Sequence, residues 1–339
     1  QDSRKVRMHI LITGGAGYIG SHAVKHFLEH DYEVVVLDNL SHGWQEAIDA
    51  LSQFGSVTFV HADLRDKAAL TQLFAAHKIS AVLHFAALCS VDESMKDPGL
   101  YFDNNVAGTL SLLEAMKEAS VQQLIFSSTC AIYGESQYLP MDEAHPTNPA
   151  NPYGESKLVV EQMIRWYGEL HNLSYVILRY FNVCGAASDG SIGDSKKPSL
   201  LLLQNAVRGA LGIEKFSYTC QKVDTPDGTP IRDYIDVEDL VSAHKAALDY
   251  LQAGGSSDVF NLGNGRGWSV KEIVSAVEDY FGISLAGEER HTRQGEYAEV
   301  YANTTKANQV LKWQTKKSLL DSIKSLEAWY KDRPNGWER

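Results

Sequence analysis

Cysteine is scarce in this chain of 339 residues, which contains four: Cys89, Cys130, Cys184 and Cys220. They form neither a C-x-x-C pair nor the spacing of a zinc site, and the twelve histidines include no H-E-x-x-H motif. The sequence therefore predicts reduced thiols and no metal site, and it argues against a disulfide framework.

Positive charge is also in deficit, with 31 Lys and Arg against 43 Asp and Glu and a net charge of -12. Such a surface disfavours nucleic acid or an anionic membrane as a partner. A small anionic ligand is still compatible with it, because one or two arginines and a helix terminus can act locally.

Long apolar runs are missing, since none reaches the roughly 18 residues of a membrane-spanning helix. Arg4, Lys5 and Arg7 precede an apolar run at Ile10–Ile19, which imitates a signal peptide. Glycines interrupt that run and no small-residue cleavage pattern follows it. We expect residues 1–7 to be a processed leader or a remnant, Met8 to be the true start, and the protein to be cytoplasmic.

The first half of the chain alternates short β-branched runs with amphipathic stretches. The predicted strands are His9–Thr13, Glu33–Asp38, Val57–His61, Ala81–Ala86, Leu124–Ser128 and Tyr175–Tyr180. The predicted helices between them are Ile19–Glu29, Lys67–His77, Val106–Ala119 and Pro152–Leu170. Continuously apolar strands that alternate with helices predict an α/β fold, a Rossmann-type doubly wound parallel sheet.

After Asn182 this alternation ends in a polar stretch rich in Gly and Ser. We expect a cofactor-binding domain over residues 8–182, with returning elements near 234–262, and a smaller α/β C-terminal domain over 183–233 and 263–335. In the second region the pattern predicts a loop at "TPDGTPIRDY" and helices near Leu200–Ala210, Glu238–Leu251, Val270–Phe281 and Leu319–Lys331.

The stretch "ITGGAGYIGSH" follows the first strand and opens the first helix, with Gly14, Gly17 and Gly20 in a G-x-x-G-x-x-G spacing. Bare backbone at a helix N-terminus lets a pyrophosphate approach. Asp38 ends the second strand about twenty residues later, where a carboxylate accepts from a ribose 2'-hydroxyl and repels a 2'-phosphate. The motif predicts NAD rather than NADP.

Asp63 ends the third strand in "HADLRD". Two readings are open for it: contact with the adenine edge, or capping of the helix that starts near Lys67.

The stretch "NPYGESK" places Tyr153 and Lys157 at i,i+4, on one face of a helix that Pro152 can start. Alone, this spacing is common in ordinary helices. Thr129 lies 24 residues earlier in "FSSTCAIYG", at the end of the fifth strand, where open α/β sheets bind ligands. The combination predicts catalysis. Lys157 can be the cation that, helped by the nicotinamide charge, lowers the pKa of Tyr153 by about three units, worth roughly 4 kcal/mol.

These motifs together resemble the extended short-chain dehydrogenase/reductase superfamily. With "LDNLS", "YFDNNVAGTLSLLEAM", "LRYFNVCGA", "GTPIRDYIDVEDL" and "NLGNGRGWSV", the chain resembles the UDP-glucose 4-epimerases from about Met8 to Trp329. The resemblance implies that Tyr153 takes the proton of the sugar 4-OH while the C4 hydride passes to tightly bound NAD, and that Thr129 bonds the same oxygen. A 4-keto sugar then turns and takes the hydride back on its other face.

The resemblance also implies further site residues. The expected cofactor contacts are Gly14, Gly17, Tyr18, Ile19, Gly20, Asp38, Asn39, Asp63, Leu64, Phe85, Ala86, Ala87, Asn104, Ser127, Tyr153, Lys157 and Tyr180. The expected substrate contacts, besides Thr129 and Tyr153, are Asn182, Arg232 in the predicted loop, Arg293, Glu296 and Val300. Arginine suits this task because its planar fork pairs with phosphate oxygens. A homodimer through the helices at Val106–Ala119 and Pro152–Leu170 is expected as well.

Four positions depart from the family pattern. Cys89 replaces a cofactor-contacting lysine, Leu200 replaces a substrate-contacting asparagine, and Thr129 replaces a serine. Val300 falls where some members have a tyrosine that closes the sugar pocket.

The substrate is left open by these patterns. "SSTCAIYGE" and "EYAEVYA" also resemble the UDP-arabinose (UDP-xylose) 4-epimerases. A pocket separates a hexose from a pentose by only about 1–3 kcal/mol without a dedicated hydrogen bond. We therefore expect UDP-glucose and UDP-galactose first, with a UDP-pentose or a UDP-N-acetylhexosamine as alternatives. A 4,6-dehydratase would need an acidic pair where Cys130 and Ala131 stand, and a non-catalytic NAD-binding protein would not need Tyr153 and Lys157.

Overall fold

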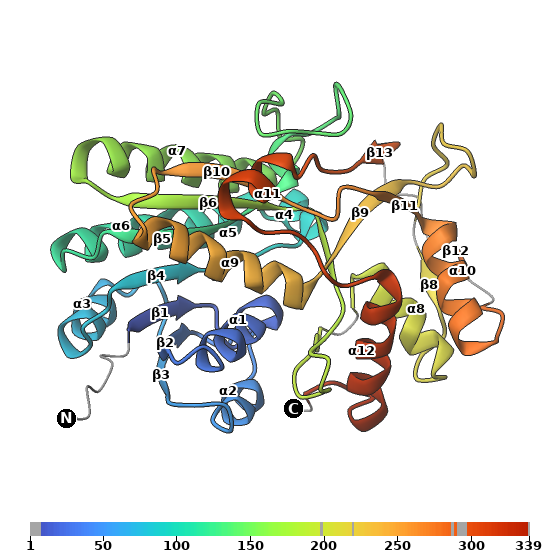
Figure 1. The fold of residues 1–339 in the computed structure, drawn as a ribbon, viewed down its shortest axis with the longest axis horizontal. Coiled ribbons are helices and arrows are strands. Elements are labelled where there is room, and N and C mark those ends of the chain that lie inside the picture. The colour runs from blue at the N-terminus through green and yellow to red at the C-terminus, as the bar shows by residue number, and fades with distance from the viewer. Residues whose placement is uncertain (1–7, 197–198, 219, 286–287, 290–296, 338–339) are drawn as a thin grey trace. The chain divides into compact units, whose positions relative to one another are not determined.

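The computed structural model describes residues 8–196, 199–218, 220–285, 288–289 and 297–337. The chain divides into two compact units. The first contains residues 1–134, 147–179 and 244–259, and the second contains residues 135–146, 180–243 and 260–339. Figure 1 shows the elements of both units in chain order, from blue to red.

A seven-stranded sheet, in the order β10-β6-β5-β4-β1-β2-β3, forms the frame of the first unit. Its strands are β1 (His9–Thr13), β2 (Glu33–Asp38), β3 (Val57–His61), β4 (Ala81–His84), β5 (Gln123–Thr129), β6 (Ser174–Tyr180) and β10 (Asp258–Leu262). Neighbouring pairs from β5 to β3 run parallel. The predicted Rossmann-type α/β class is thus confirmed, and sequence reasoning missed β10.

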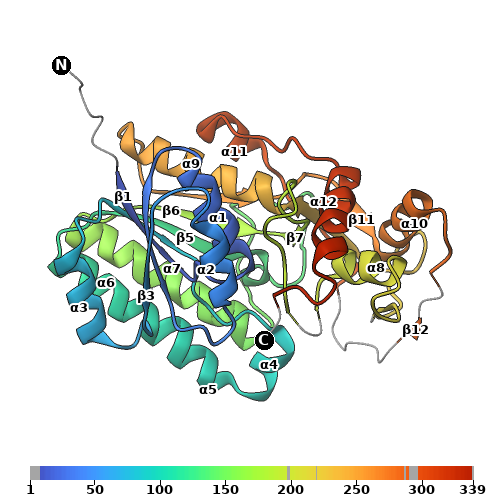
Figure 2. The same cartoon turned by 90° about the horizontal axis from the view of Figure 1, so that it is seen from below.

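Helices follow the strands of this sheet. They are α1 (Tyr18–Leu28), α2 (Gln45–Leu51), α3 (Lys67–Ala76), α4 (Val91–Lys96), α5 (Pro98–Tyr101), a π-helix η1 (Phe102–Ala107), α6 (Gly108–Glu118), a 3-10 turn η2 (Cys130–Ile132), α7 (Pro152–His171) and α9 (Val237–Gln252). Figure 2 shows α3, α6 and α7 on one side of the sheet and α1 and α2 on the other.

Apolar side chains from both layers fill the space between the sheet and the α3–α6–α7 layer. Leu11, Val82 and Leu124 of the strands belong to one buried cluster with Leu112 of α6 and Ile164 of α7. Strand β2 is buried along nearly its whole length, which explains its uninterrupted apolar sequence.

Shorter elements build the second unit. They are β7 (Asn182–Cys184), α8 (Leu202–Ala210), β8 (Ser217–Tyr218), β9 (Ile231–Asp236), β11 (Gly267–Ser269), α10 (Val270–Phe281), β12 (Glu288–Glu289), β13 (Glu299–Val300), α11 (Thr305–Leu311) and α12 (Leu319–Asp332). β9 pairs with β7, β11 and β13.

One expectation for these segments was wrong. The predicted loop "TPDGTPIRDY" ends in strand β9, which buries Asp233 because the backbone amides of Asn264, Gly265 and Ala302 donate to its carboxylate. In the first unit, the predicted helix at Val106–Ala119 is confirmed as α6, and the π-helix η1 precedes it.

Among the described residues, no helix is both long and apolar enough to cross a membrane.

Candidate active site

The turn between β1 and α1 has the shape that a dinucleotide needs. Gly14 has a positive φ of 72°, and a Cβ there would lie 2.7 Å from the backbone nitrogen of Ala86. A Cβ at Gly20 would lie 2.0 Å from the carbonyl oxygen of Gly14. Helix α1 begins at Tyr18, after Gly17, and has no acidic side chain in its first turn. The turn therefore leaves the α1 N-terminus open to the phosphates of a cofactor.

Asp38 is held at the end of β2 by two backbone amides. Its Oδ2 accepts from Ala16 N at 3.0 Å and its Oδ1 from Leu40 N at 2.8 Å. Burial raises the pKa of this carboxyl above its ordinary value, while the two amides act in the opposite direction. Each oxygen keeps a second lone pair, so the group can still accept from ribose hydroxyls.

Asp63 does not cap the next helix. Asp66 takes that role, since its side chain accepts from Ala69 N at the start of α3. Asp63 instead accepts from Asn39 Nδ2 at 2.8 Å and from Arg65, whose hydrogen bonds hold the pKa of this carboxyl below its usual range. The capping reading was wrong, and Asp63 lies beside Asn39, another expected cofactor contact.

The segment after β4 is tied to the turn after β1. Phe85 N donates to the carbonyl oxygen of Thr13 at 3.1 Å, and Ala86 N donates to Thr13 Oγ1 at 3.3 Å. The Phe85 ring lies 4.7 Å from the His244 ring, between centroids. The backbone at Ala86 is thus fixed beside Gly14, the other side of the expected cofactor site.

Asn104 lies in the π-helix η1, an irregularity that often marks functional sites. Its Nδ2 donates to Asn105 Oδ1 at 3.0 Å. Asn105 is buried and bonds both backbone groups of Leu88 as well as Ser156 Oγ. This network fixes Asn104 relative to α7, which contains Ser156.

Thr129 and Tyr153 are joined by a side-chain hydrogen bond. Thr129 Oγ1 accepts from Ala131 N at 3.1 Å, so its hydroxyl proton is available for the tyrosine oxygen. Asn151 caps α7 and sets its start, since the Asn151 side chain accepts from Gly154 N. The predicted hydroxyl pair is therefore brought together.

Lys157 lies one turn after Tyr153, and its Nζ donates to the carbonyl oxygen of Ser127 at 2.8 Å. Burial lowers the pKa of Lys157 to about 8. Burial also raises the pKa of Tyr153, and the thiol of Cys89 adds to this rise. The lowering of the tyrosine pKa by Lys157, with the nicotinamide charge helping, therefore stays a prediction.

Cys89 stands where a lysine was expected in the family, and its side chain is near those of Tyr153 and Lys157. A thiolate there would raise the pKa of Tyr153 and of Lys157. In this way the departure at Cys89 affects the pKa values of Tyr153 and Lys157.

The substrate residues expected in the second unit lie on strands. Arg232 is on β9, not in a loop, and its Nη1 donates to the carbonyl oxygen of Ile231 at 2.8 Å. Val300 is buried on β13 in register with Arg232. Asn182 starts β7, in register with Tyr234 of β9. β9 thus brings Arg232 and Val300 together.

Four further positions were singled out in the sequence, and the structure describes two of them. Arg293 and Glu296 lie outside the described residues. Tyr180 is buried at the end of β6, and Leu200, the departure from asparagine, is exposed.

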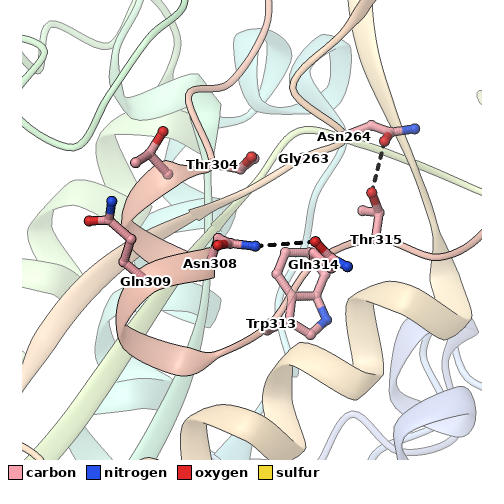
Figure 3. A pocket seen from close by; sticks show the side chains of 9 residues that line it. Gly263, Asn264, Thr304, Asn308, Gln309, Trp313, Gln314 and Thr315 are labelled. Carbon is pink, nitrogen blue, oxygen red and sulfur yellow. Dashed lines mark hydrogen bonds between the residues drawn. The ribbon is translucent and has the colours of Figure 1, made fainter.

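A pocket of about 340 Å³ in the second unit (Figure 3) contains none of the predicted site residues. It is lined by Gly263, Asn264, Thr304, Thr305, Asn308, Gln309, Trp313, Gln314 and Thr315. Asn308 bonds Gln314, and Thr315 bonds Asn264. Its lining has no cation to pair with a diphosphate, so we do not assign it to the reaction.

Sequence reasoning missed three buried residues beside the group of Thr129, Tyr153 and Lys157: they are Ser128, Glu161 and Arg179. Ser128 Oγ donates to Glu161 Oε1 at 2.6 Å, and Arg179 Nη2 lies 2.7 Å from Glu161 Oε2. The spacing Tyr153, Lys157, Glu161 is i, i+4, i+8, and this periodicity could have indicated Glu161.

The fold, the glycine turn and the Thr–Tyr–Lys group define a class: a Rossmann-type, dinucleotide-dependent enzyme of the short-chain dehydrogenase/reductase kind. Residues 10–263 match the model of the NAD dependent epimerase/dehydratase family. The chain belongs to this family, as its sequence predicted.

Individual relatives agree over nearly the full length. A UDP-glucose 4-epimerase of Halalkalibacterium halodurans is 43% identical, over 97% of this chain and 98% of the relative. The crystal structure of UDP-glucose 4-epimerase from Bifidobacterium longum, in complex with NAD+ and UDP, has a TM-score of 0.93 at 36% identity, over 97% of this chain and 100% of the other. A probable UDP-arabinose 4-epimerase of Oryza sativa is 40% identical, over 97% of this chain and 81% of the relative.

Proposed function

We propose that this chain is a UDP-sugar 4-epimerase, that UDP-glucose and UDP-galactose are its main substrates, and that NAD stays bound through turnover. The observation that carries the proposal is the group formed by Thr129, Tyr153 and Lys157 at the end of β5. Relatives named UDP-glucose 4-epimerase support the choice of sugar.

The residues present fit NAD. Gly14 and Gly20 allow the tight turn that presents the N-terminus of α1, because a Cβ at either would clash with the backbone, and Asp38 offers a carboxylate to the ribose. When bound, NAD would supply the hydride acceptor for C4 of the sugar and a positive charge that favours the tyrosine phenolate. Asn39, Asp63 and Asn104 would hold it further.

Tyr153 is the proposed base for the sugar 4-OH. Because Thr129 donates toward the tyrosine oxygen, the pair can stabilise the phenolate and orient the proton transfer. Lys157, buried and held by Ser127, supplies a nearby positive charge. The same tyrosine returns the proton when the 4-keto sugar is reduced on its other face.

Arg232 is proposed to bind the diphosphate and Val300 to border the sugar. Valine is small, so an N-acetylated hexose is a second candidate substrate. A UDP-pentose is a third, favoured by the identity to the rice UDP-arabinose relative. Asn182, Arg293 and Glu296 complete the proposed substrate set.

We also propose a homodimer through α6 and α7. Large apolar side chains are exposed on these helices and on the preceding segment: Met95, Phe102, Leu110, Trp166 and Leu170. A second copy of this chain would cover them. The cytoplasm is the proposed compartment, because a chain with four cysteines and no paired spacing is typical of reducing surroundings.

Proton NMR on an equimolar mixture of UDP-galactose and UDP-L-arabinopyranose, without added NAD, tests the substrate. The UDP-glucose anomeric signal should grow first. Earlier growth of the UDP-xylose signal would make the chain a pentose epimerase, and no change in either would refute the proposed function.

A further inference from the structure

A buried ion pair lies directly behind the catalytic group. Both Glu161 and Arg179 are almost wholly inaccessible to solvent. The guanidinium grips the carboxylate in a fork, with Arg179 Nε 3.0 Å from Glu161 Oε1 and Nη2 2.7 Å from Oε2. Arg179 Nη1 also donates to the hydroxyl of Tyr133 at 2.9 Å. Such a pair is rigid, because the buried guanidinium and carboxylate groups bond to each other and to neighbouring hydroxyl groups in place of water.

One further donor ties this ion pair to the strand. Ser128 Oγ donates to Glu161 Oε1 at 2.6 Å, and Ser128 is buried too. Ser128 stands between Ser127, whose carbonyl oxygen accepts from Lys157, and Thr129. Because peptide units are planar and stiff, fixing Ser128 also fixes the peptide groups on both sides of it.

Helix α7 therefore contacts each of the last three residues of β5. Tyr153, Lys157 and Glu161 follow one another by four residues on α7, so their side chains lie above one another. The first two contact Thr129 and Ser127. Glu161 supplies the third attachment point, and it is the one furthest from the reacting atoms.

We infer that Glu161, held by Arg179, is a positioning residue. Through its hydrogen bond with Ser128, it fixes the end of β5 so that the Thr129 hydroxyl lies within bonding distance of Tyr153. This inference rests on the proposed function, because it assigns a purpose to the geometry of that site. Glu161 does not touch the reacting atoms itself. A displacement of about 1 Å at reacting groups can cost up to about a hundredfold in rate.

Ser128→Ala isolates the attachment, because it leaves Glu161 and Arg179 paired. We expect kcat for UDP-galactose to fall about tenfold while KM and the amount of retained NAD stay unchanged. The melting temperature should drop by no more than about 4 °C, as for the loss of one hydrogen bond. Ser111→Ala is the matched control: Ser111 is buried on α6, its hydroxyl bonds the carbonyl of Ala107, and its loss should not change kcat.

The outcomes separate the two claims. A lower kcat at constant KM and NAD content supports the positioning role. A wild-type kcat in Ser128→Ala, or a loss that follows NAD content or melting temperature, would overturn it and leave the epimerase assignment intact. An inactive parent protein would overturn the proposed function.

Discussion

The ammonium of Lys157 donates a hydrogen bond to the backbone carbonyl oxygen of Ser127 over 2.8 Å. This bond anchors the lysine to the end of β5 while burial lowers its pKa to about 8. The electrostatic contributions of Cys89 and Glu161 act in the opposite direction and favour the charged form of Lys157. The protein thus places a cation beside Tyr153 at a cost in folding free energy.

That cost has a measurable pH dependence. An unfolded lysine titrates near 10.4, so the folded chain binds this proton less tightly than the unfolded chain does. Compared with Lys157→Met, the cofactor-free wild type should gain stability as the pH rises from about 8 to about 10.4, by on the order of 3 kcal/mol. Urea unfolding of both proteins at several pH values measures this. A constant difference would show that Lys157 is not desolvated.

Removal of the proposed base should leave the fold in place. Tyr153→Phe should retain NAD and its melting temperature but lose at least about a hundredfold in turnover, because no group remains to take the 4-OH proton. Tyr138→Phe is the control, since Tyr138 is exposed and bonds Asp142. Activity like the wild type in Tyr153→Phe would remove the tyrosine from the mechanism.

Asp38 should decide between the two nicotinamide cofactors. Asp38→Ala removes the acceptor for the ribose hydroxyls and the negative charge that repels a 2'-phosphate. NAD retention should fall by about tenfold while NADP binding improves relative to NAD, as measured on refolded protein by calorimetry. Asp49→Ala, at an exposed position of α2, should change neither. An unaltered preference for NAD over NADP would show that the ribose does not bind at Asp38.

The sequence predicts an element well when residues close to it in the chain determine its structure, and poorly when distant residues do. β1, β2, β3 and α10 have the predicted limits, because a continuous apolar run or the capping box of Ser269 and Glu272 fixes them. β9 was missed because Asp233 looks like a loop residue. Only amides from distant parts of the chain, at Gly265 and Ala302, make its burial tolerable.

The site shows the same limit. The hydroxyl, tyrosine and lysine are separated by fixed spacings on one strand and one helix, so the sequence could indicate them. The partner of Lys157 is the backbone carbonyl of Ser127. The partner of Glu161 is Arg179, which lies on β6. Neither has a sequence signature, and the rise in the pKa of Tyr153 follows from burial, which depends on the whole fold.

Val300 should determine which sugars are accepted. Val300→Tyr places a bulky ring on β13 in register with Arg232. We expect it to suppress any turnover of UDP-N-acetylglucosamine while leaving UDP-galactose within about threefold. Val310→Tyr, at an exposed position of α11, is the control. Equal effects on turnover of both UDP-sugars would show that residue 300 does not select between them.

The proposed homodimer depends on exposed apolar groups of α7. A double change, Trp166→Glu and Leu170→Glu, should convert the particle to a monomer in sedimentation velocity. Leu320→Glu, also at an exposed apolar position, should not alter the assembly. A wild-type protein that sediments as a monomer would contradict the interface.

The most direct test of the central claim follows the hydrogen on C4. UDP-galactose that contains deuterium at C4 is incubated with the purified protein without added NAD. Proton NMR and mass spectrometry should show UDP-glucose with the deuterium still on C4, because the hydride leaves and returns within one bound complex. Loss of the deuterium to solvent, or turnover only after NAD is added, would contradict an epimerase that keeps its own cofactor.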